Sequence, residues 1–218
     1  MARIDDFIQA RALSKRELSE KDIASIARFS GAGIIENGKT LLLKVLNRDI
    51  IITWPEMEFS YNGSNEEVPI QQQVLHLHYM NGVCNSKIEK NRGEWISFQD
   101  IPDGRFYMDA FIKRAKDPLL RTFGTNPKKM VELASSVYNA SPLEFGDFSV
   151  AVNAFPMTPV ALVLWQGDDE FPAEGNILFD GSISGILSAE DIALLAGMVV
   201  YPLIGMAKGK MEDLKSEI

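Results

Sequence analysis

The sequence predicts an α+β fold: antiparallel strands, in an N-terminal meander and a C-terminal hairpin, pack with helices and are closed by an apolar C-terminal helix. Three observations support this class. Short apolar and β-branched runs follow one another near the N-terminus and again after residue 148. Stretches with apolar residues at helical spacing lie before and between these runs. The chain then ends with a long uncharged stretch over residues 192–207, which is typical of a buried helix.

The composition is that of a globular protein. Of the 218 residues, 46% are hydrophobic and 24% are charged. The chain has 22 Lys+Arg and 30 Asp+Glu, a formal net charge of −8, which argues against nucleic acid or an anionic membrane surface as its main partner. We expect one compact domain over residues 1–218, with lobes at 1–146 and 147–218 if it divides.

Cys84 is the only cysteine of the chain. A single thiol excludes an intrachain disulfide, and it excludes an iron–sulfur cluster or a cysteine-ligated zinc site built by this chain alone. We therefore expect no cofactor of these kinds. The first six residues carry two acids and no apolar segment, unlike a secretory signal. These features predict a cytoplasmic protein.

The N-terminal part is predicted to contain a helix followed by a meander. Two capping boxes, Ser14 with Glu17 and Ser19 with Asp22, mark helix starts, and apolar spacing predicts a helix over residues 20–29. Apolar, β-branched or alternating runs predict three strands, with a hairpin between the first two: 40–46, 50–53 and 56–61.

The segment from Pro69 to Met80 fits two structures. Residues 75–79 alternate like a strand, but a leading proline and three glutamines favour a helix that ends at Asn81-Gly82. His76 and His78 would share a face on a strand, whereas on a helix they lie about 200° apart. In a hairpin, Cys84 would point away from both. A His/His/Cys metal site is therefore not expected in either structure.

The rest of the chain is predicted to begin with helices and to continue with strands. Helices are expected over residues 105–116 and 118–123, the second ending at Gly124, and another begins at Asn126-Pro127. Strands are expected at 148–153, 160–165 and 176–179, the first two as a hairpin.

The last helix is predicted from its cap and its apolar body. Ser188 with Asp191 forms a capping box, and the uncharged stretch that follows has 16 residues. This is shorter than the roughly 20 residues needed to span a bilayer. We expect a core helix or a homodimer interface rather than a membrane segment.

The acids Asp168, Asp169 and Glu170, after the strand that ends at Trp165, are the sharpest functional signal. Successive carboxylates repel one another unless water, a cation or basic side chains compensate. Asp180 follows the next apolar run and can join them. The spacing matches no known calcium loop. Three alternatives stay open: structural capping or ion pairs, recognition of a ligand or partner, and cation binding.

The negative charge is concentrated in one part of the chain. From Asp147 to Ala207 there are eight acids and no Lys or Arg. Basic partners for the acidic loop must therefore come from another segment or from the terminal tail, and we expect the basic N-terminal helices to supply them. If they do not reach it, the acidic face is free for a cation or a basic partner.

Three other side chains are candidates for a functional surface. His78 fits either a buried, hydrogen-bonded role or a pocket role. Trp95 and Phe98 precede a turn at residues 101–104, where they can line a groove or fix the loop to the core. Motifs for a nucleophile elbow, a phosphate-binding loop or dinucleotide binding are absent from the sequence.

Three stretches in this order together resemble the DUF3786 family, a domain of unknown function: 75–80, 93–104 and 155–180, the last with Phe155-Pro156, Trp165, Asp168–Pro172 and Leu178–Asp180. The resemblance implies a member of a family found largely in anaerobic bacteria and archaea, in which some relatives carry a cysteine-rich iron–sulfur module. Cys84 alone cannot hold such a cluster. The resemblance implies no particular reaction.

We expect a non-enzymatic accessory factor of anaerobic metabolism that binds a small molecule or a protein, with a homodimer as its expected assembly. Nucleic acid and membranes are not expected partners. The expected ligand or partner surface comprises His78, Trp95, Phe98, Trp165, Asp168, Asp169, Glu170 and Asp180. The alternative is an enzyme or a divalent-cation-dependent protein that uses Asp168, Asp169, Glu170 and Asp180 as ligands or proton carriers.

Overall fold

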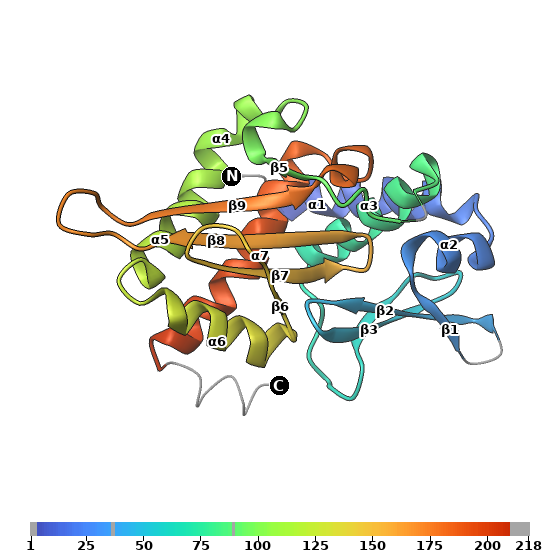
Figure 1. Ribbon diagram of the computed structural model, residues 1–218. Coiled ribbons are helices and arrows are strands. Elements are labelled where there is room, and N and C mark those ends of the chain that lie inside the picture. Colours follow the sequence, from blue (N-terminus) through green and yellow to red (C-terminus); the bar gives the residue numbers. More distant parts are fainter. Residues whose placement is uncertain (1–3, 36–37, 89, 210–218) are drawn as a thin grey trace.

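The computed structural model describes residues 4–35, 38–88 and 90–209. Its α+β fold confirms the predicted class, and Figure 1 shows two antiparallel sheets with helices packed against them. The chain passes from the first sheet to the second after the long helix that ends at Ser86.

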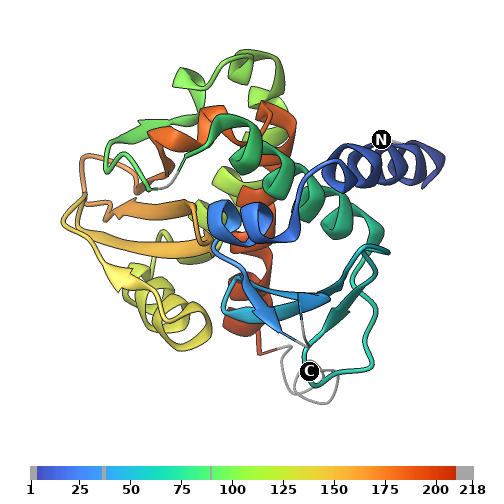
Figure 2. The same ribbon diagram turned by 90° about the vertical axis from the view of Figure 1, so that its right-hand side faces the viewer.

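The first sheet has four strands in chain order. Its elements are α1 (Ile4–Ser19), α2 (Ile23–Ser30), β1 (Gly33–Ile35), β2 (Thr40–Val45), β3 (Arg48–Thr53), β4 (Phe59–Tyr61) and α3 (Ile70–Ser86). β2 and β3 form the predicted hairpin, with Val45 opposite Arg48, and β4 continues the predicted meander. The sequence pattern did not predict β1, a short edge strand beside β2. Figure 2 shows α1 and α3 side by side next to this sheet.

The two predicted capping boxes at the N-terminus are wrong. Ser14 is buried inside α1, because this helix begins at Ile4. Ser19 ends α1, and Asp22 is itself the N-cap of α2: its carboxylate accepts a hydrogen bond from the Ser25 amide at 3.0 Å. Serine and aspartate are equally good N-caps, so the spacing alone did not identify the residue that performs this role.

The preferred helix over residues 69–80 is confirmed, but its predicted end is wrong. α3 continues through Asn81 and Gly82 to Ser86, and Lys87 is the left-handed C-cap. Gly82 is needed for packing, because a Cβ there would lie 1.9 Å from the carbonyl oxygen of Ile186. The Asn-Gly pair therefore marks a close approach of two backbones and not a helix end.

The second sheet has the order β5-β9-β8-β7-β6. Its elements, with the helices between them, are β5 (Trp95–Ser97), η2 (Phe98–Asp100), α4 (Gly104–Phe111), η3 (Ile112–Lys116), α5 (Asp117–Phe123), α6 (Pro127–Tyr138), β6 (Ser141–Pro142), β7 (Phe148–Phe155), β8 (Thr158–Trp165), β9 (Glu174–Asp180), η4 (Gly181–Gly185) and α7 (Ala189–Ala207). The three predicted strands, the β7–β8 hairpin and the Asn126 and Ser188 caps are confirmed. β5 was not predicted.

α4, η3 and α5 form one unbroken helical rod where the sequence predicted two helices. η3 is a π-helix, and the Asp117 amide donates to the carbonyl of Ile112, five residues earlier. Pro118 lacks an N–H and would clash with the carbonyl of Arg114 in a regular α-helix. The wider π turn ahead of Pro118 lets the rod continue, and it ends at Gly124 as predicted.

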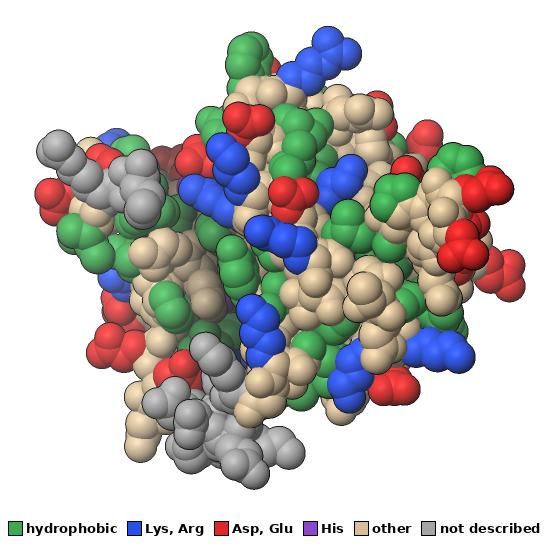
Figure 3. Space-filling model, turned by 90° about the vertical axis from the view of Figure 1, so that its left-hand side faces the viewer, with side chains coloured by type: hydrophobic (Ala, Val, Ile, Leu, Met, Phe, Trp, Pro, Cys, Tyr) green, Lys and Arg blue, Asp and Glu red, His purple; other side chains and the backbone are tan. Residues whose placement is uncertain are grey.

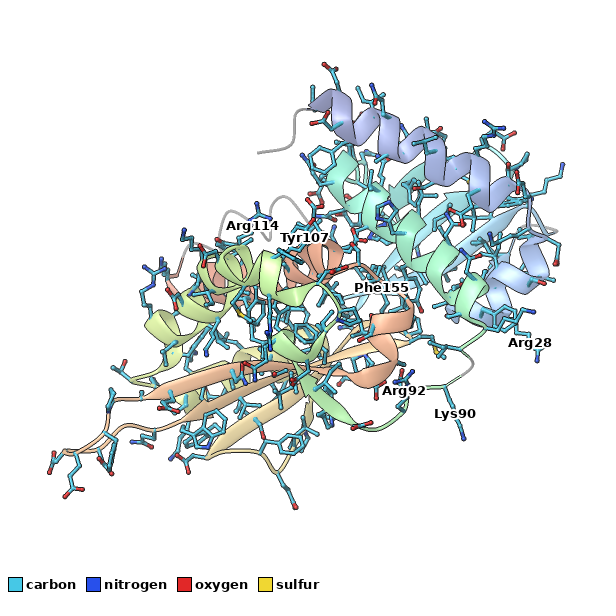
Figure 4. The ribbon with its side chains drawn as sticks, turned by 90° about the horizontal axis from the view of Figure 1, so that it is seen from above. Arg28, Lys90, Arg92, Tyr107, Arg114 and Phe155 are labelled. Carbon is cyan, nitrogen blue, oxygen red and sulfur yellow. The ribbon has the colours of Figure 1, made fainter. Side chains whose placement is uncertain are left out.

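The two sheets share one contiguous set of buried hydrophobic residues. Tyr79 of α3 joins them: its hydroxyl donates to the Ser30 carbonyl at 2.7 Å and accepts from the Met157 amide at 3.1 Å. Its ring stacks on Phe155 at a centroid distance of 4.3 Å, and Figure 4 labels Phe155 where the second sheet meets α3.

α7 is long and apolar enough to cross a membrane by length and composition, and it is the one such helix among the described residues. However, 56% of its apolar window is buried inside the fold, as expected for a core helix. Its side chains lie among those of α4, α5 and α6. The structure therefore confirms the predicted apolar closing helix.

Candidate functional site

The acidic loop lies at the tip of the hairpin between β8 and β9, and Asp168 shapes this tip. The Asp168 carboxylate accepts hydrogen bonds from the amides of Phe171 at 2.8 Å and Glu170 at 2.9 Å. These two bonds lower the pKa of Asp168. Asp169 and Glu170 are exposed, and within the described residues neither forms an ion pair. Of the three consecutive acids, Asp168 is therefore the one with the structural role.

Asp180 is buried at the opposite end of β9. Its carboxylate accepts hydrogen bonds from the amides of Gly93 at 2.7 Å and Arg92 at 3.0 Å, and from both the amide and the hydroxyl of Ser182. Burial raises the pKa of Asp180, but these hydrogen bonds outweigh that effect and leave the pKa below its ordinary value. Asp180 thus fixes the loop before β5, which contains Arg92 (Figure 4), to the end of the sheet.

The four carboxylates of the alternative hypothesis do not converge. Asp180 and Glu174 stand at the two ends of the seven-residue strand β9, and the acidic tip lies beyond Glu174. Over the part of the chain that the structure describes, no three His, Cys, Asp or Glu side chains are grouped closely enough to hold a metal ion. The geometry gives this alternative no support.

His78 is half-buried and bound to Asp191 of α7. Its Nδ1 lies 3.0 Å from both carboxylate oxygens of Asp191, one of which also accepts a hydrogen bond from the Ser188 hydroxyl at 2.8 Å. The hydrogen bond to Asp191 raises the pKa of His78, and burial opposes it to a smaller degree. His78 therefore connects α3 to the first turn of α7.

The predicted aromatic residues divide between the core and the surface. Phe98 is 1% exposed and stacks on Phe111 at 4.2 Å, so its place in the predicted surface is wrong. Trp95 and Trp165 lie on one face of the second sheet, because their cross-strand partners are six residues apart on β9. Trp95 also makes an edge contact with Phe145 at 6.3 Å.

The N-terminal basic residues do not reach the acidic tip. Arg11 and Lys15 pair with Glu58 at 2.8 and 2.7 Å, and the pairs Lys44–Asp49 and Arg48–Glu66 also stay within the first sheet. The expectation that these helices neutralise the acidic loop is therefore wrong. The terminal tail, the other expected source, lies outside the described residues from residue 210 onward.

A basic pocket that the sequence did not predict lies between the rod and the end of α7. It is a depression of about 630 Å³, and Figure 3 shows Lys and Arg side chains gathered across this end of the molecule. The residues that line it are Lys113, Pro118, Arg121, Thr122, Tyr201, Ile204, Ala207 and Lys208.

The pocket has a cationic part and an apolar part. Lys113, Arg121 and Lys208 are exposed and form no ion pair with any described residue. The Nε of Arg121 donates only to the backbone carbonyl of Asp117, at 3.3 Å. Carboxylate side chains are absent from the described lining, and Tyr201 is 54% exposed above the apolar residues. Positive charge without a counter-charge attracts an anion.

The π turn explains why sequence reasoning missed this pocket. In a regular α-helix, Lys113 and Pro118 lie about 140° apart. The extra residue of η3 reduces this angle, so that Lys113 and Pro118 line the same pocket. Lys208 follows α7 and comes from a distant part of the chain. Sequence spacing carries no signal of this arrangement.

The comparisons with known proteins give one finding. The family described as "Domain of unknown function (DUF3786)" matches residues 22–202. Neither a curated protein nor a solved structure matches significantly.

Proposed function

The chain belongs to the DUF3786 family, and from the geometry we propose that it is a non-enzymatic binding factor that holds an anionic ligand in the basic pocket. The observation that carries this proposal is the set of three cationic side chains, Lys113, Arg121 and Lys208, around one depression without a carboxylate in its described lining. At exposed positions one such contact between a cation and an anion is worth about 0–1 kcal/mol, so the pocket relies on several of them acting together.

The size and lining of the pocket indicate an organic anion. Its volume of about 630 Å³ lies inside the roughly 300–1,000 Å³ that small-molecule sites occupy, and it is far larger than a simple inorganic anion requires. Pro118, Tyr201 and Ile204 offer apolar surface beside the cations. A ligand with an acidic group and an apolar or aromatic part would use both halves of the pocket.

The lining supports binding and not catalysis. Among its described residues it has no His, Cys, Asp or Glu, so no imidazole, thiol or carboxylate lies beside the hydroxyl groups of Thr122 and Tyr201. The proposal includes a cytoplasmic location, which the buried free thiol of Cys84 supports. It also includes the accessory role in anaerobic metabolism that the family resemblance implies.

The test uses anilinonaphthalene sulfonate, a fluorescent anion with an aromatic body, and pyrophosphate as a competitor. We expect saturable binding that a Lys113→Gln/Arg121→Gln variant weakens at least about tenfold, which corresponds to about 1.4 kcal/mol. The matched control is Arg105→Gln/Lys128→Gln, which removes two exposed charges outside the pocket lining. Equal affinity of both variants, or the absence of saturable binding to the native protein, would contradict the proposal.

A further inference from the structure

The hairpin tip at residues 166–173 projects from the second sheet, as Figures 1 and 4 show. It presents Asp169 and Glu170 together with Phe171, whose side chain is 68% exposed. Asp168 holds the tip in shape through its two hydrogen bonds to backbone amides. The preformed turn presents this ring to solvent, where a partner surface can bury it.

The tip and the basic pocket have complementary chemistry. The two free carboxylates match the cations Lys113 and Arg121, and an aromatic ring matches the apolar lining around Tyr201. Both surfaces lack ion pairs among the described residues. Opposite potentials that face each other steer association and suppress wrong contacts.

The tip does not occupy the pocket of its own chain. The base of the hairpin packs against another side of α5, where a Cβ at Gly124 would lie 3.4 Å from the Cβ of Ala173 and a Cβ at Gly175 would lie 3.6 Å from Leu120. The pocket instead uses Pro118, Arg121 and Thr122 of this region. Phe171 is 68% exposed, so its ring is available to a surface on another molecule.

The two surfaces lie at the same end of the molecule. Figure 3, which looks onto this end, shows basic side chains across the middle of the face and a group of acidic side chains at its right-hand edge. Neighbouring patches of opposite character form a self-complementary surface, so a two-fold axis can place each tip in the pocket of the other copy. Such an exchange closes as a dimer and does not continue into a fibre.

We propose that the hairpin tip of a second copy of this chain docks into the basic pocket, with Phe171 against Tyr201 and with Asp169 and Glu170 beside Lys113 and Arg121. This inference rests on the proposed function, because it assigns to the same pocket a partner that competes with its ligand. Anion binding then releases the dimer, and the dimer lowers the apparent affinity for the anion.

The test exchanges charges between the two surfaces. A tip variant, Asp169→Lys/Glu170→Lys, and a pocket variant, Lys113→Glu/Arg121→Glu, each place like charges in contact within their own dimer. In a mixed dimer, the basic tip of one variant meets the acidic pocket of the other, and the acidic tip meets the basic pocket, so both contacts join opposite charges. We measure sedimentation from about 5 to about 300 μM at low salt.

We expect dimerisation of the native protein, at least about tenfold weaker dimerisation of each variant alone, and recovery in the mixture. Phe171→Ala, which changes no charge, weakens the dimer as well, and Arg105→Glu/Lys128→Glu leaves it intact. A native protein that stays monomeric, a variant that dimerises normally, or a mixture that does not recover would each overturn the inference. Circular dichroism of every variant checks that it is folded, so that differences in dimerisation are compared between folded proteins.

The tip variant separates the two proposals, because its pocket is unchanged. If the native protein is monomeric but the tip variant binds anilinonaphthalene sulfonate, the inference fails and the proposed function stands. If the native protein dimerises and the tip variant dimerises poorly, but the tip variant fails to bind the anion, the contact between copies stands and the proposed function fails.

Discussion

His76 makes the stability of this protein sensitive to acid. The imidazole is fully buried in α3 between Phe59 and Phe155, at centroid distances of 5.8 and 5.6 Å. Neither ring nitrogen has a hydrogen-bond partner among the residues that the structure describes. Burial therefore lowers the pKa of His76 from 6.5 to about 3.

The direction and size of the effect follow from this pKa. Below about pH 6.5 the unfolded chain binds a proton at this histidine, whereas the folded protein does not bind it until about pH 3. Stability from this group is therefore complete above pH 6.5 and is lost as the pH falls toward 3. At about 1.4 kcal/mol for each pH unit, the loss is about 3 kcal/mol at pH 4.5 and about 5 kcal/mol near pH 3.

A His76→Phe variant isolates this contribution, because other groups titrate equally in both proteins. We expect the variant to be at least as stable at about pH 7, since it removes two unsatisfied buried nitrogens that cost about 1–3 kcal/mol. Between pH 7 and 4.5 it should lose about 3 kcal/mol less than the native protein. Urea unfolding followed by tryptophan fluorescence measures both values. Equal losses on acidification in the two proteins would refute the buried, neutral state of His76.

Two further predictions test the contacts of α3 with the C-terminal part of the chain. His78→Gln should destabilise the protein by about 1 kcal/mol or less below about pH 6.5. Because Asp191 raises the pKa of His78 in the folded protein, this difference should vanish above pH 6.5, as the pH rises through the raised pKa. Thermal unfolding at several pH values measures it, and a difference that grows with pH would show the opposite sign. Gly82→Ala places a Cβ 1.9 Å from the Ile186 carbonyl oxygen and should cost about 2–4 kcal/mol. The matched change Gly205→Ala, with no atom within 4 Å, should be neutral or slightly stabilising, and equal melting temperatures would contradict the close approach.

The parts of the fold that local patterns determine could be predicted from the sequence. The β2–β3 and β7–β8 hairpins and the Ser188 cap depend on neighbouring residues, and their patterns identified them. β1 and β5 are three-residue strands that exist because a neighbouring strand offers hydrogen bonds. Their own residues carry too short a pattern to indicate a strand.

Features that depend on distant contacts could not be predicted in this way. Gly82 looks like a helix C-cap in sequence, and only the backbone of Ile186 gives it another role. Asp180 looks like a member of the acidic cluster, but amides from residues 92 and 93 bind it. In both cases the residue type was informative, and the partner, which decides the role, came from elsewhere in the chain.

The charge pattern connects the sequence with the proposed dimer. The acidic stretch from residue 147 to 207 lacks Lys and Arg. Basic residues of α1 and of the first sheet form ion pairs near that sheet, with Glu58, Asp49 and Glu66. Lys113, Arg121 and Lys208, which form no ion pair with any described residue, lie on the rod and after α7, where they line the basic pocket. The acidic tip and the basic pocket lie at adjacent sites but do not contact each other within one molecule. Their opposite charges therefore favour a contact between molecules. The contact should therefore weaken with added salt. Among variants of the two surfaces, salt should weaken it least in those that keep Phe171 and the apolar lining of the pocket.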